Sequence, residues 1–184
     1  MTQPMRQYPL YVIADCSGSM AESGKARVLA YLLSYIAEHL RLQRLPAWCA
    51  GVQAFAWAAD VRPLALPVEH DLAPLRPEGR ANATVLMGTL EGLLADVPAP
   101  PRILLISDGG IDHAAQKCCQ GWRSRFPVDL RAVAVGADAS RLALEALAGK
   151  GQVFDAEDIG VAVQDWESMQ PSPLCIANTQ SDEW

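Results

Sequence analysis

The chain alternates between two patterns of apolar and polar positions, one typical of strands and one typical of helices. Short runs that are apolar almost throughout predict strands buried on both faces of a sheet. These runs are residues 9–14, 47–57, 61–66, 102–107, 128–135 and 152–154. Longer segments with an apolar residue every three or four positions predict helices with one buried face. These segments are residues 25–42, 86–94, 112–125, 140–148 and 159–169.

The order of these elements predicts an α/β, doubly wound fold. Strands that alternate with helices favour a mostly parallel sheet, here six-stranded, with helices on both faces. One connection differs, because only residues 58–60 separate the second and third runs, too few for a crossover helix. The third run is therefore expected to be one antiparallel edge strand, and Pro63 within it suits an edge. Residues 1–170 are expected to form one domain, and residues 171–184 a mobile polar tail.

Composition and charge exclude several classes of function. With 51% hydrophobic and 20% charged residues, the chain is expected to be globular rather than disordered. Its net charge of −6 and its lack of a run of Lys and Arg argue against nucleic-acid binding. No segment is long and apolar enough to span a membrane, and no secretion signal precedes the first strand. Five cysteines, an odd number without metal-binding spacing, indicate a reducing compartment, so we expect a cytoplasmic protein.

Five hydroxyl and carboxylate side chains stand where strands end or a helix begins. Asp15, Ser17 and Ser19 directly follow the first strand, Asp108 follows the fourth, and Thr84 lies between them in sequence. In an open α/β sheet, ligands bind at the carboxyl ends of the strands. All five side chains offer hard oxygen atoms, which suit magnesium. Because serine and threonine are neutral ligands, the ion would keep enough positive charge to attract one more carboxylate from a partner.

Each of these motifs, taken alone, is also compatible with a role that involves no metal. Ser17 and Ser19 could cap the helix that follows, and Asp108 could belong to an ordinary turn. Asp112 and His113 could act as acid and base, but an N-cap at Asp112 beside a solvated His113 is the simpler interpretation. Both oxygen-bearing motifs together, each at the carboxyl end of a strand, favour a metal site.

Aromatic and thiol side chains at apolar positions are interpreted as core. Trp48, Trp57, Trp122 and Trp166 are expected to pack inside. Cys16 lies between two of the oxygen-bearing residues, but sulfur does not suit magnesium, so its side chain is expected to point into the core.

Three motifs, taken in order, resemble the von Willebrand factor A (VWA) family. They are Asp-Cys-Ser-Gly-Ser-Met at residues 15–20, a threonine that opens a later helix, and Ile-Ser-Asp-Gly at residues 106–109. The resemblance covers roughly residues 8–170 and implies the Rossmann-like VWA fold. The five oxygen-bearing residues match this family's metal-ion-dependent adhesion site (MIDAS).

The resemblance also implies a role for each residue of the first motif. The hydroxyls of Ser17 and Ser19 are expected to coordinate Mg²⁺, with Mn²⁺ or Ca²⁺ as substitutes. Asp15 is expected to anchor their loop and the coordinating waters.

The remaining two ligands implied by the resemblance are Thr84 and Asp108. They are similar to the pair that exchanges between direct and water-mediated contact with the ion. Thr89 is the alternative threonine, but Thr84 leaves Leu90 at the helix position that the family fills with leucine.

Within the family, the chain looks most like stand-alone bacterial domains of the TerY-like tellurite-resistance and stress-response type. This implies a non-enzymatic, magnesium-dependent interaction module, with no nucleic-acid or membrane partner. The expected partner is a kinase, phosphatase or other signalling enzyme that supplies an Asp or Glu to the metal, with residues 67–83 as a rim of the contact face. Two alternatives stay open: a magnesium-dependent phosphatase with Asp15 as nucleophile, although Ser17 stands where such enzymes need a second aspartate, and a structural subunit with a silent metal site.

Overall fold

The computed structural model describes residues 8–67, 75–95, 97, 101–126, 128–164 and 166. Part of the predicted loop at residues 67–83, the end of the last predicted helix and the predicted tail at residues 171–184 lie outside this range. No helix among the described residues is long and apolar enough to cross a membrane.

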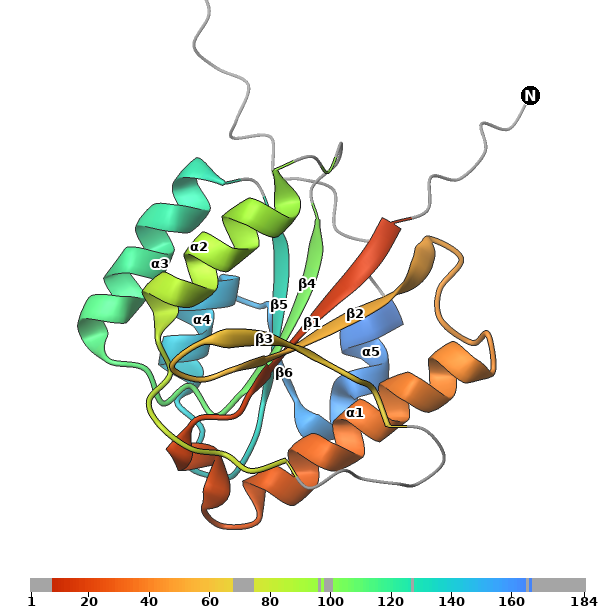
Figure 1. The fold of residues 1–184 in the computed structure, drawn as a ribbon, viewed down its shortest axis with the longest axis horizontal. Coiled ribbons are helices and arrows are strands. Elements are labelled where there is room, and N and C mark those ends of the chain that lie inside the picture. Colours follow the sequence, from red (N-terminus) through yellow and green to blue (C-terminus); the bar gives the residue numbers. More distant parts are fainter. Residues whose placement is uncertain are drawn as a thin grey trace, which may run out of the picture.

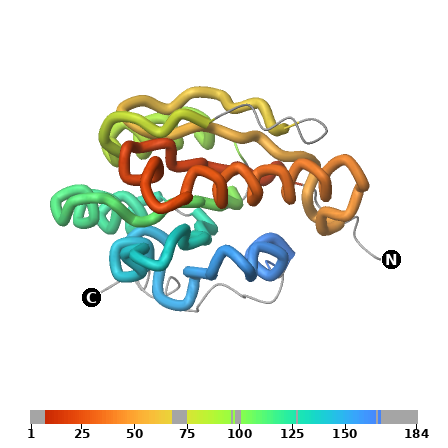
Figure 2. The backbone as a smooth tube through the Cα atoms, turned by 90° about the horizontal axis from the view of Figure 1, so that it is seen from below, coloured from red at the N-terminus to blue at the C-terminus, as the bar shows by residue number. Residues whose placement is uncertain are grey.

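Six strands in the described part of the chain form one sheet, in the order β3-β2-β1-β4-β5-β6. They are β1 (Tyr8–Asp15), β2 (Cys49–Trp57), β3 (Val61–Leu64), β4 (Arg102–Ser107), β5 (Asp129–Ala134) and β6 (Val153–Asp155). Every neighbouring pair is parallel except β2 and β3, which run antiparallel. The predicted mostly parallel, six-stranded sheet with one antiparallel edge strand is therefore confirmed. Figure 2 shows β2 and β3 in orange and yellow at one edge, and the blue C-terminal elements at the other.

The α-helices of the described residues cover both faces of this sheet (Figure 1). They are α1 (Lys25–Arg41), α2 (Ala83–Leu94), α3 (His113–Arg125), α4 (Arg141–Ala148) and α5 (Ile159–Gln164). Helices α1 and α5 pack on one face, and α2, α3 and α4 pack on the other. Two short 3₁₀ helices, η1 (Gly18–Ala21) and η2 (Ala156–Asp158), were not expected from the sequence.

Strand β1 shows why the sequence pattern predicts a central strand. Leu10 and Val12 face the α1 side, whereas Tyr11 and Ile13 face the α2 side, and all four are at most 4% exposed. Because both faces are covered, the strand is apolar from Leu10 to Ala14. Burying each such side chain contributes about 1.5–3 kcal/mol to folding. The strand is thereby fixed in place, and Asp15 at its end is fixed with it.

The predicted core is confirmed for the tryptophans and for Cys16, with small corrections at helix ends. Exposure is low for Trp48 (2%), Trp57 (0%), Trp122 (3%), Trp166 (6%) and Cys16 (4%). By contrast, two leucines of the predicted apolar stripes, Leu40 in α1 and Leu93 in α2, are 38% and 37% exposed. Both lie in the last turn of their helix. Periodicity gives the direction of a helix face, but it does not say where along the axis the covering sheet ends.

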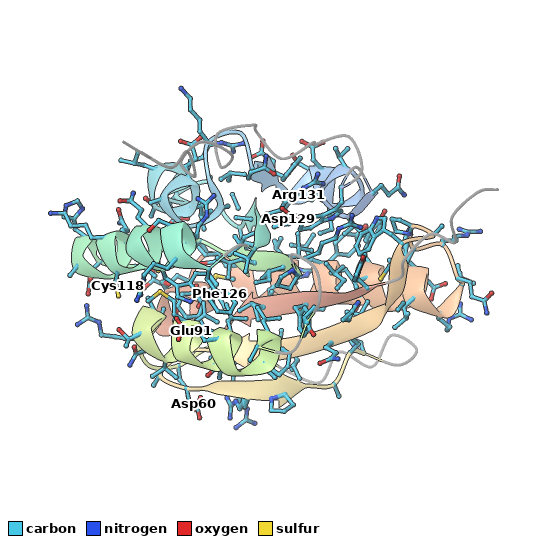
Figure 3. The ribbon with its side chains drawn as sticks, turned by 90° about the horizontal axis from the view of Figure 1, so that it is seen from above. Asp60, Glu91, Cys118, Phe126, Asp129 and Arg131 are labelled. Carbon is cyan, nitrogen blue, oxygen red and sulfur yellow. The ribbon has the colours of Figure 1, made fainter. Side chains whose placement is uncertain are left out.

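The amino ends of β4 and β5 carry a cluster of arginine and aromatic side chains. The Arg102 guanidinium stacks 4.1 Å from the ring centre of Trp48, and the Arg131 guanidinium stacks 4.4 Å from that of Trp166. Arg131 also donates hydrogen bonds to backbone oxygens of α5, 3.0 Å from that of Ala162. Figure 3 shows Arg131 beside Asp129 on β5. This cluster ties α5 to the sheet at the amino ends of β4 and β5, away from their carboxyl ends.

Candidate metal centre

The candidate site lies at the topological switch point of the sheet. From β1 the chain moves outward through β2 to the edge strand β3, and then crosses to β4 on the other side of β1. In doubly wound folds with this strand order, ligands bind outside the carboxyl ends of the two strands where the order reverses. Those ends are Asp15 on β1 and Ser107 on β4. In Figure 1, β1 leads from the upper right to the red loop at the lower left, where the site lies.

Asp15 is fully buried and holds the loop that follows it. Its Oδ1 accepts a hydrogen bond from the Ser17 amide at 2.8 Å, and its Oδ2 accepts one from the Ser107 hydroxyl at 2.6 Å. The Ser107 oxygen in turn accepts from the Gly109 amide at 2.9 Å, so one carboxylate ties the loop after β1 to the loop after β4. Burial raises the pKa of Asp15, and the nearby negative charge of Asp108 adds to this, while the hydrogen bonds from Ser107 and Ser17 oppose it.

Ser17, Ser19 and Asp108 contribute three oxygen atoms that successive hydrogen bonds connect. The Ser17 and Ser19 hydroxyl oxygens lie 3.3 Å apart, and the Ser19 hydroxyl donates to Asp108 Oδ1 at 3.2 Å. Residues from loops 89 positions apart in sequence therefore meet. We call Ser17 Oγ, Ser19 Oγ and Asp108 Oδ1 the oxygen triangle.

The spacing of the oxygen triangle fits a small divalent ion. Octahedral magnesium with ligands at about 2.0–2.1 Å requires neighbouring ligand oxygens to lie about 2.9 Å apart. The two observed separations, 3.3 Å and 3.2 Å, need only a slight contraction. The donor set, two neutral hydroxyls and one carboxylate, is also one that magnesium accepts. In these two separations and in donor chemistry, the residues present fit such an ion.

Helix capping does not account for the two serines. Ser17 precedes η1, but its side chain makes no capping hydrogen bond there, and the residue that precedes α1 is Gly24. The hydroxyls of Ser17 and Ser19 are directed at one another and at Asp108 instead of at free backbone amides. A cluster of three or more His, Cys, Asp or Glu side chains able to hold a metal does not occur among the described residues. A metal site of the zinc type is thus not found there, and the hydroxyl-rich set is the candidate.

Thr84 is not hydrogen-bonded to the oxygen triangle within the described range. It is the second residue of α2, it is exposed, and within the described range its side chain forms no hydrogen bond to Ser17, Ser19 or Asp108. The alternative, Thr89, lies more than one turn further along α2 and is half-buried. Hydrogen bonds therefore connect four of the five residues predicted from the sequence, and Thr84 as the fifth ligand stays a prediction.

Thr84 instead lines an open groove of about 490 Å³ between the first turns of α2 and α3. Arg80, Asp112 and Cys118 line the same groove, and Figure 3 shows Cys118 on the side of α3 toward α2. Asp112 Oδ1 accepts from the Ala115 amide at 2.8 Å, so the predicted N-cap is confirmed. Its Oδ2 lies 3.7 Å from the Arg80 guanidinium.

Lys25, at the start of α1, is part of the site and was not predicted from the sequence. Its side chain is 3% exposed, and its ammonium donates to Asp108 Oδ2 and to Asp138 Oδ2, both at 2.8 Å. Burial lowers the pKa of Lys25, but the hydrogen bonds and charges of the two carboxylates outweigh this effect, so its pKa is raised. The hydrogen bond from Lys25 holds the pKa of Asp138 below its usual value. One signal was available in the sequence: a lysine in the first turn of a helix faces the positive end of the helix dipole, which favours a nearby anion.

Two glycines leave room for this arrangement. A Cβ atom at Gly110 would lie 2.9 Å from Ser19 Oγ and 3.0 Å from Asp108 Oδ1. Gly136 has φ +94°, and a Cβ there would lie 2.8 Å from Lys25 Cε. Both the oxygen triangle and the path of the lysine side chain thus depend on the absence of a side chain at one neighbouring position.

Neither a family model nor a curated protein sequence matches the chain. Several solved structures do match the chain. The manganese-loaded TRAP protein of Plasmodium vivax has a TM-score of 0.64 at 15% identity, covering 86% of this chain and 72% of that protein. Proximal thread matrix protein 1 from the mussel byssus, with a zinc-occupied MIDAS motif, has a TM-score of 0.60 at 13% identity, covering 86% and 45%. The von Willebrand factor type A structure from Catenulispora acidiphila has a TM-score of 0.57 at 16% identity, covering 85% and 41%.

This chain has the von Willebrand factor A fold. It spans less than half of the mussel and Catenulispora proteins. Identities of 13–16% establish the arrangement of strands and helices but not an activity. Manganese in the TRAP structure and zinc in the mussel structure are properties of those proteins. What this chain binds has to be argued from its own residues.

Proposed function

We propose that this protein is a non-enzymatic interaction module of the VWA type that binds its partner through a divalent ion, with Mg²⁺ as the resident ion. Ser17, Ser19 and Asp108 would hold the ion, and Thr84 would reach it through water or after a shift of the start of α2. The observation that carries the proposal is the oxygen triangle at the switch point of the sheet. Metal in the MIDAS of a structural neighbour supports it as an analogy.

The ion would supply a positive centre that a partner's carboxylate can complete. Two hydroxyls and one carboxylate neutralise only half of a divalent charge, so a further anionic ligand is favoured. We infer that the partner contributes one Asp or Glu, and that it is a protein such as a kinase, phosphatase or other signalling enzyme. A TerY-like role in a bacterial stress response, in the cytoplasm, is the setting that the sequence resemblance implies.

The segment before α2 is suited to form the rim of the contact face. The Gly18 amide donates to the Gly79 oxygen at 2.9 Å, and the Glu78 amide donates to the Cys16 oxygen at 2.8 Å. The described part of the loop predicted at residues 67–83 therefore packs directly on the Ser17 loop. A partner that reached the ion would touch both.

The experiment compares partner capture by wild type, Ser17→Ala and Asp112→Ala, with MgCl₂ or with EDTA. Bound proteins are quantified by mass spectrometry. We expect a partner that wild type and Asp112→Ala retain with MgCl₂, and that EDTA or Ser17→Ala releases. Mutating single Asp and Glu residues of that partner should identify one that is indispensable. A partner retained equally by all variants and in EDTA would show that recognition uses another surface.

One observation favours a second candidate, a structural subunit with a silent site. The ammonium of Lys25 already lies 2.8 Å from Asp108 Oδ2, where it neutralises the carboxylate without an ion. If that pair never opens, the ion is excluded and the fold serves as a scaffold only. Metal titration of wild type separates the two candidates.

A further inference from the structure

Lys25 is the most unusual side chain at the site. Lysine is almost never fully buried unless it is paired. Here the side chain is 3% exposed, and its ammonium is shared between two carboxylates that differ in their surroundings. Asp108 is 4% exposed and belongs to the oxygen triangle, whereas Asp138 is 61% exposed and lies in the loop after β5.

The two oxygens of Asp108 are divided between the triangle and the lysine. Oδ1 accepts from the Ser19 hydroxyl at 3.2 Å and from the Gly110 amide at 2.9 Å. Oδ2 accepts from the Lys25 ammonium at 2.8 Å. A cation bound at the triangle and the ammonium would therefore share one carboxylate, and their like charges would repel each other. The structure holds one positive charge at this carboxylate already.

The route of the lysine side chain is defined by its neighbours. Its Cε and Cγ pass close to Gly136, where a Cβ would lie 2.8 Å and 3.2 Å from them. Gly136 and Asp138 belong to the same loop, so the loop that makes room for the lysine side chain also supplies its second carboxylate. The ammonium has an alternative partner within reach when Asp108 is taken.

We propose that Lys25 is a tethered cation that competes with the metal for Asp108, and that Asp138 is the anchor to which its ammonium withdraws when the metal binds. The inference rests on the proposed function, because it concerns the same ion. Metal affinity is then set by three residues together: Asp108 attracts the ion, Lys25 opposes it, and Asp138 weakens the opposition. Lys25 and Asp138 act as affinity-determining residues without being ligands.

The proposal gives opposite signs for the two substitutions. Lys25→Met keeps most of the side-chain volume and removes the charge, so Mg²⁺ and Mn²⁺ affinity should rise about tenfold or more. Asp138→Asn leaves the ammonium with Asp108 as its one charged partner, so affinity should fall. In the Lys25→Met/Asp138→Asn double variant, the effect of Asp138→Asn should vanish, because no ammonium is left to anchor. A purely structural role of these residues would not produce this sign pattern.

The test is isothermal titration of chelator-stripped protein with MnCl₂ and MgCl₂, at one pH and one ionic strength. The charge-matched control is Lys150→Met, which removes an exposed lysine. We expect tighter binding for Lys25→Met alone, weaker binding for Asp138→Asn, and little change for Lys150→Met. Binding seen in Lys25→Met but not in wild type would also support the competition, while assigning wild type to the silent-site candidate.

Three outcomes would overturn the inference, and only the third would also overturn the proposed function. If wild type binds metal and Lys25→Met binds no more tightly, the lysine does not compete. If Lys25→Met does not fold, Asp138→Asn decides, because the exposed Asp138 side chain can be replaced without disturbing the core. Unchanged or tighter metal binding by Asp138→Asn would refute the role of Asp138 as the anchor of the Lys25 ammonium. If neither wild type nor folded Lys25→Met binds either ion, the metal proposal and this inference fall together.

Discussion

Substituting Gly110 tests the oxygen triangle without removing any of its oxygens. An added Cβ would lie 2.9 Å from Ser19 Oγ and 3.0 Å from Asp108 Oδ1, closer than carbon and oxygen atoms normally approach. The backbone at Gly110 is not left-handed, and the residue is exposed, so alanine itself is acceptable to the fold. The strain falls on the two oxygens, and Ser19 can relieve it only by turning its short side chain away. Gly110→Ala should therefore spare folding and impair metal binding.

The expected size of the magnesium-induced shift in melting temperature follows from the linkage between ion binding and folding. An ion at a hundredfold excess over its dissociation constant stabilises the folded state by about 2.7 kcal/mol. Disturbing residues that position metal ligands typically weakens binding by about 10–100-fold. At the same ion concentration, a hundredfold loss of ion affinity reduces the stabilisation of the folded state to about 0.4 kcal/mol. In a domain of this size, each kcal/mol of stabilisation raises the melting temperature by about 2–4 °C. We therefore expect magnesium to raise it by about 5–10 °C for wild type and by about 1–2 °C for Gly110→Ala.

The assay is a thermal melt with MgCl₂ and with EDTA, and Gly88→Ala is the matched control. Gly88 lies in α2, and a Cβ there would meet nothing within 4 Å. Alanine favours the helix at this position by roughly 0.5–1 kcal/mol, so Gly88→Ala should melt higher with its magnesium shift unchanged. A full magnesium shift in Gly110→Ala would refute the reasoning, because the ion would then bind without the triangle.

Three further results are expected. Alkylation of the native protein, read by peptide mass spectrometry, should modify the exposed Cys118 well before Cys16 and Cys119. Burial raises the pKa of both buried thiols to about 11, which lowers their reactivity. Early labelling of Cys16 would contradict its place in the core. Asp112→Ala removes the N-cap of α3 and should lower the free energy of unfolding by about 0.5–2 kcal/mol in denaturant titrations while leaving metal affinity intact; a loss of metal binding would place Asp112 in the site. Phosphomonoester hydrolysis should be undetectable, because the Asp15 carboxylate is fully buried with both oxygens engaged and cannot attack a substrate; magnesium-dependent turnover abolished by Asp15→Asn would establish the phosphatase alternative.

The fold could be predicted from the sequence because its information is local. The unbroken apolar run at Leu10–Ala14 indicates a strand covered on both faces, and the three-residue link before Val61 excludes a crossover. Strand type, helix faces and chain order together leave few topologies. The carboxyl ends of β1 and β4 follow from that topology, and with them the placement of Asp15 and Asp108 at the ends of neighbouring strands.

The partner of each polar side chain could not be predicted in the same way. Lys25 and Asp138 are 113 positions apart, and no periodicity links them. Their contact depends on how α1 sits against the loop after β5. Thr84 shows the opposite case: its position at the start of α2 was predictable, but the direction of its hydroxyl depends on the helix orientation. The sequence pattern locates the loops of the site, and packing decides which side chains meet there.

The location of the ion is the central claim, and paramagnetic broadening by Mn²⁺ in amide NMR spectra tests it most directly. Substoichiometric MnCl₂ should first erase the signals of Ser17, Ser19 and Gly110, and excess MgCl₂ should restore them. Amides at the amino ends of the strands, such as Arg102, should keep their intensity throughout. Broadening centred elsewhere, for example on the acidic turn at Asp158, with the Ser17 loop unaffected, would contradict the account.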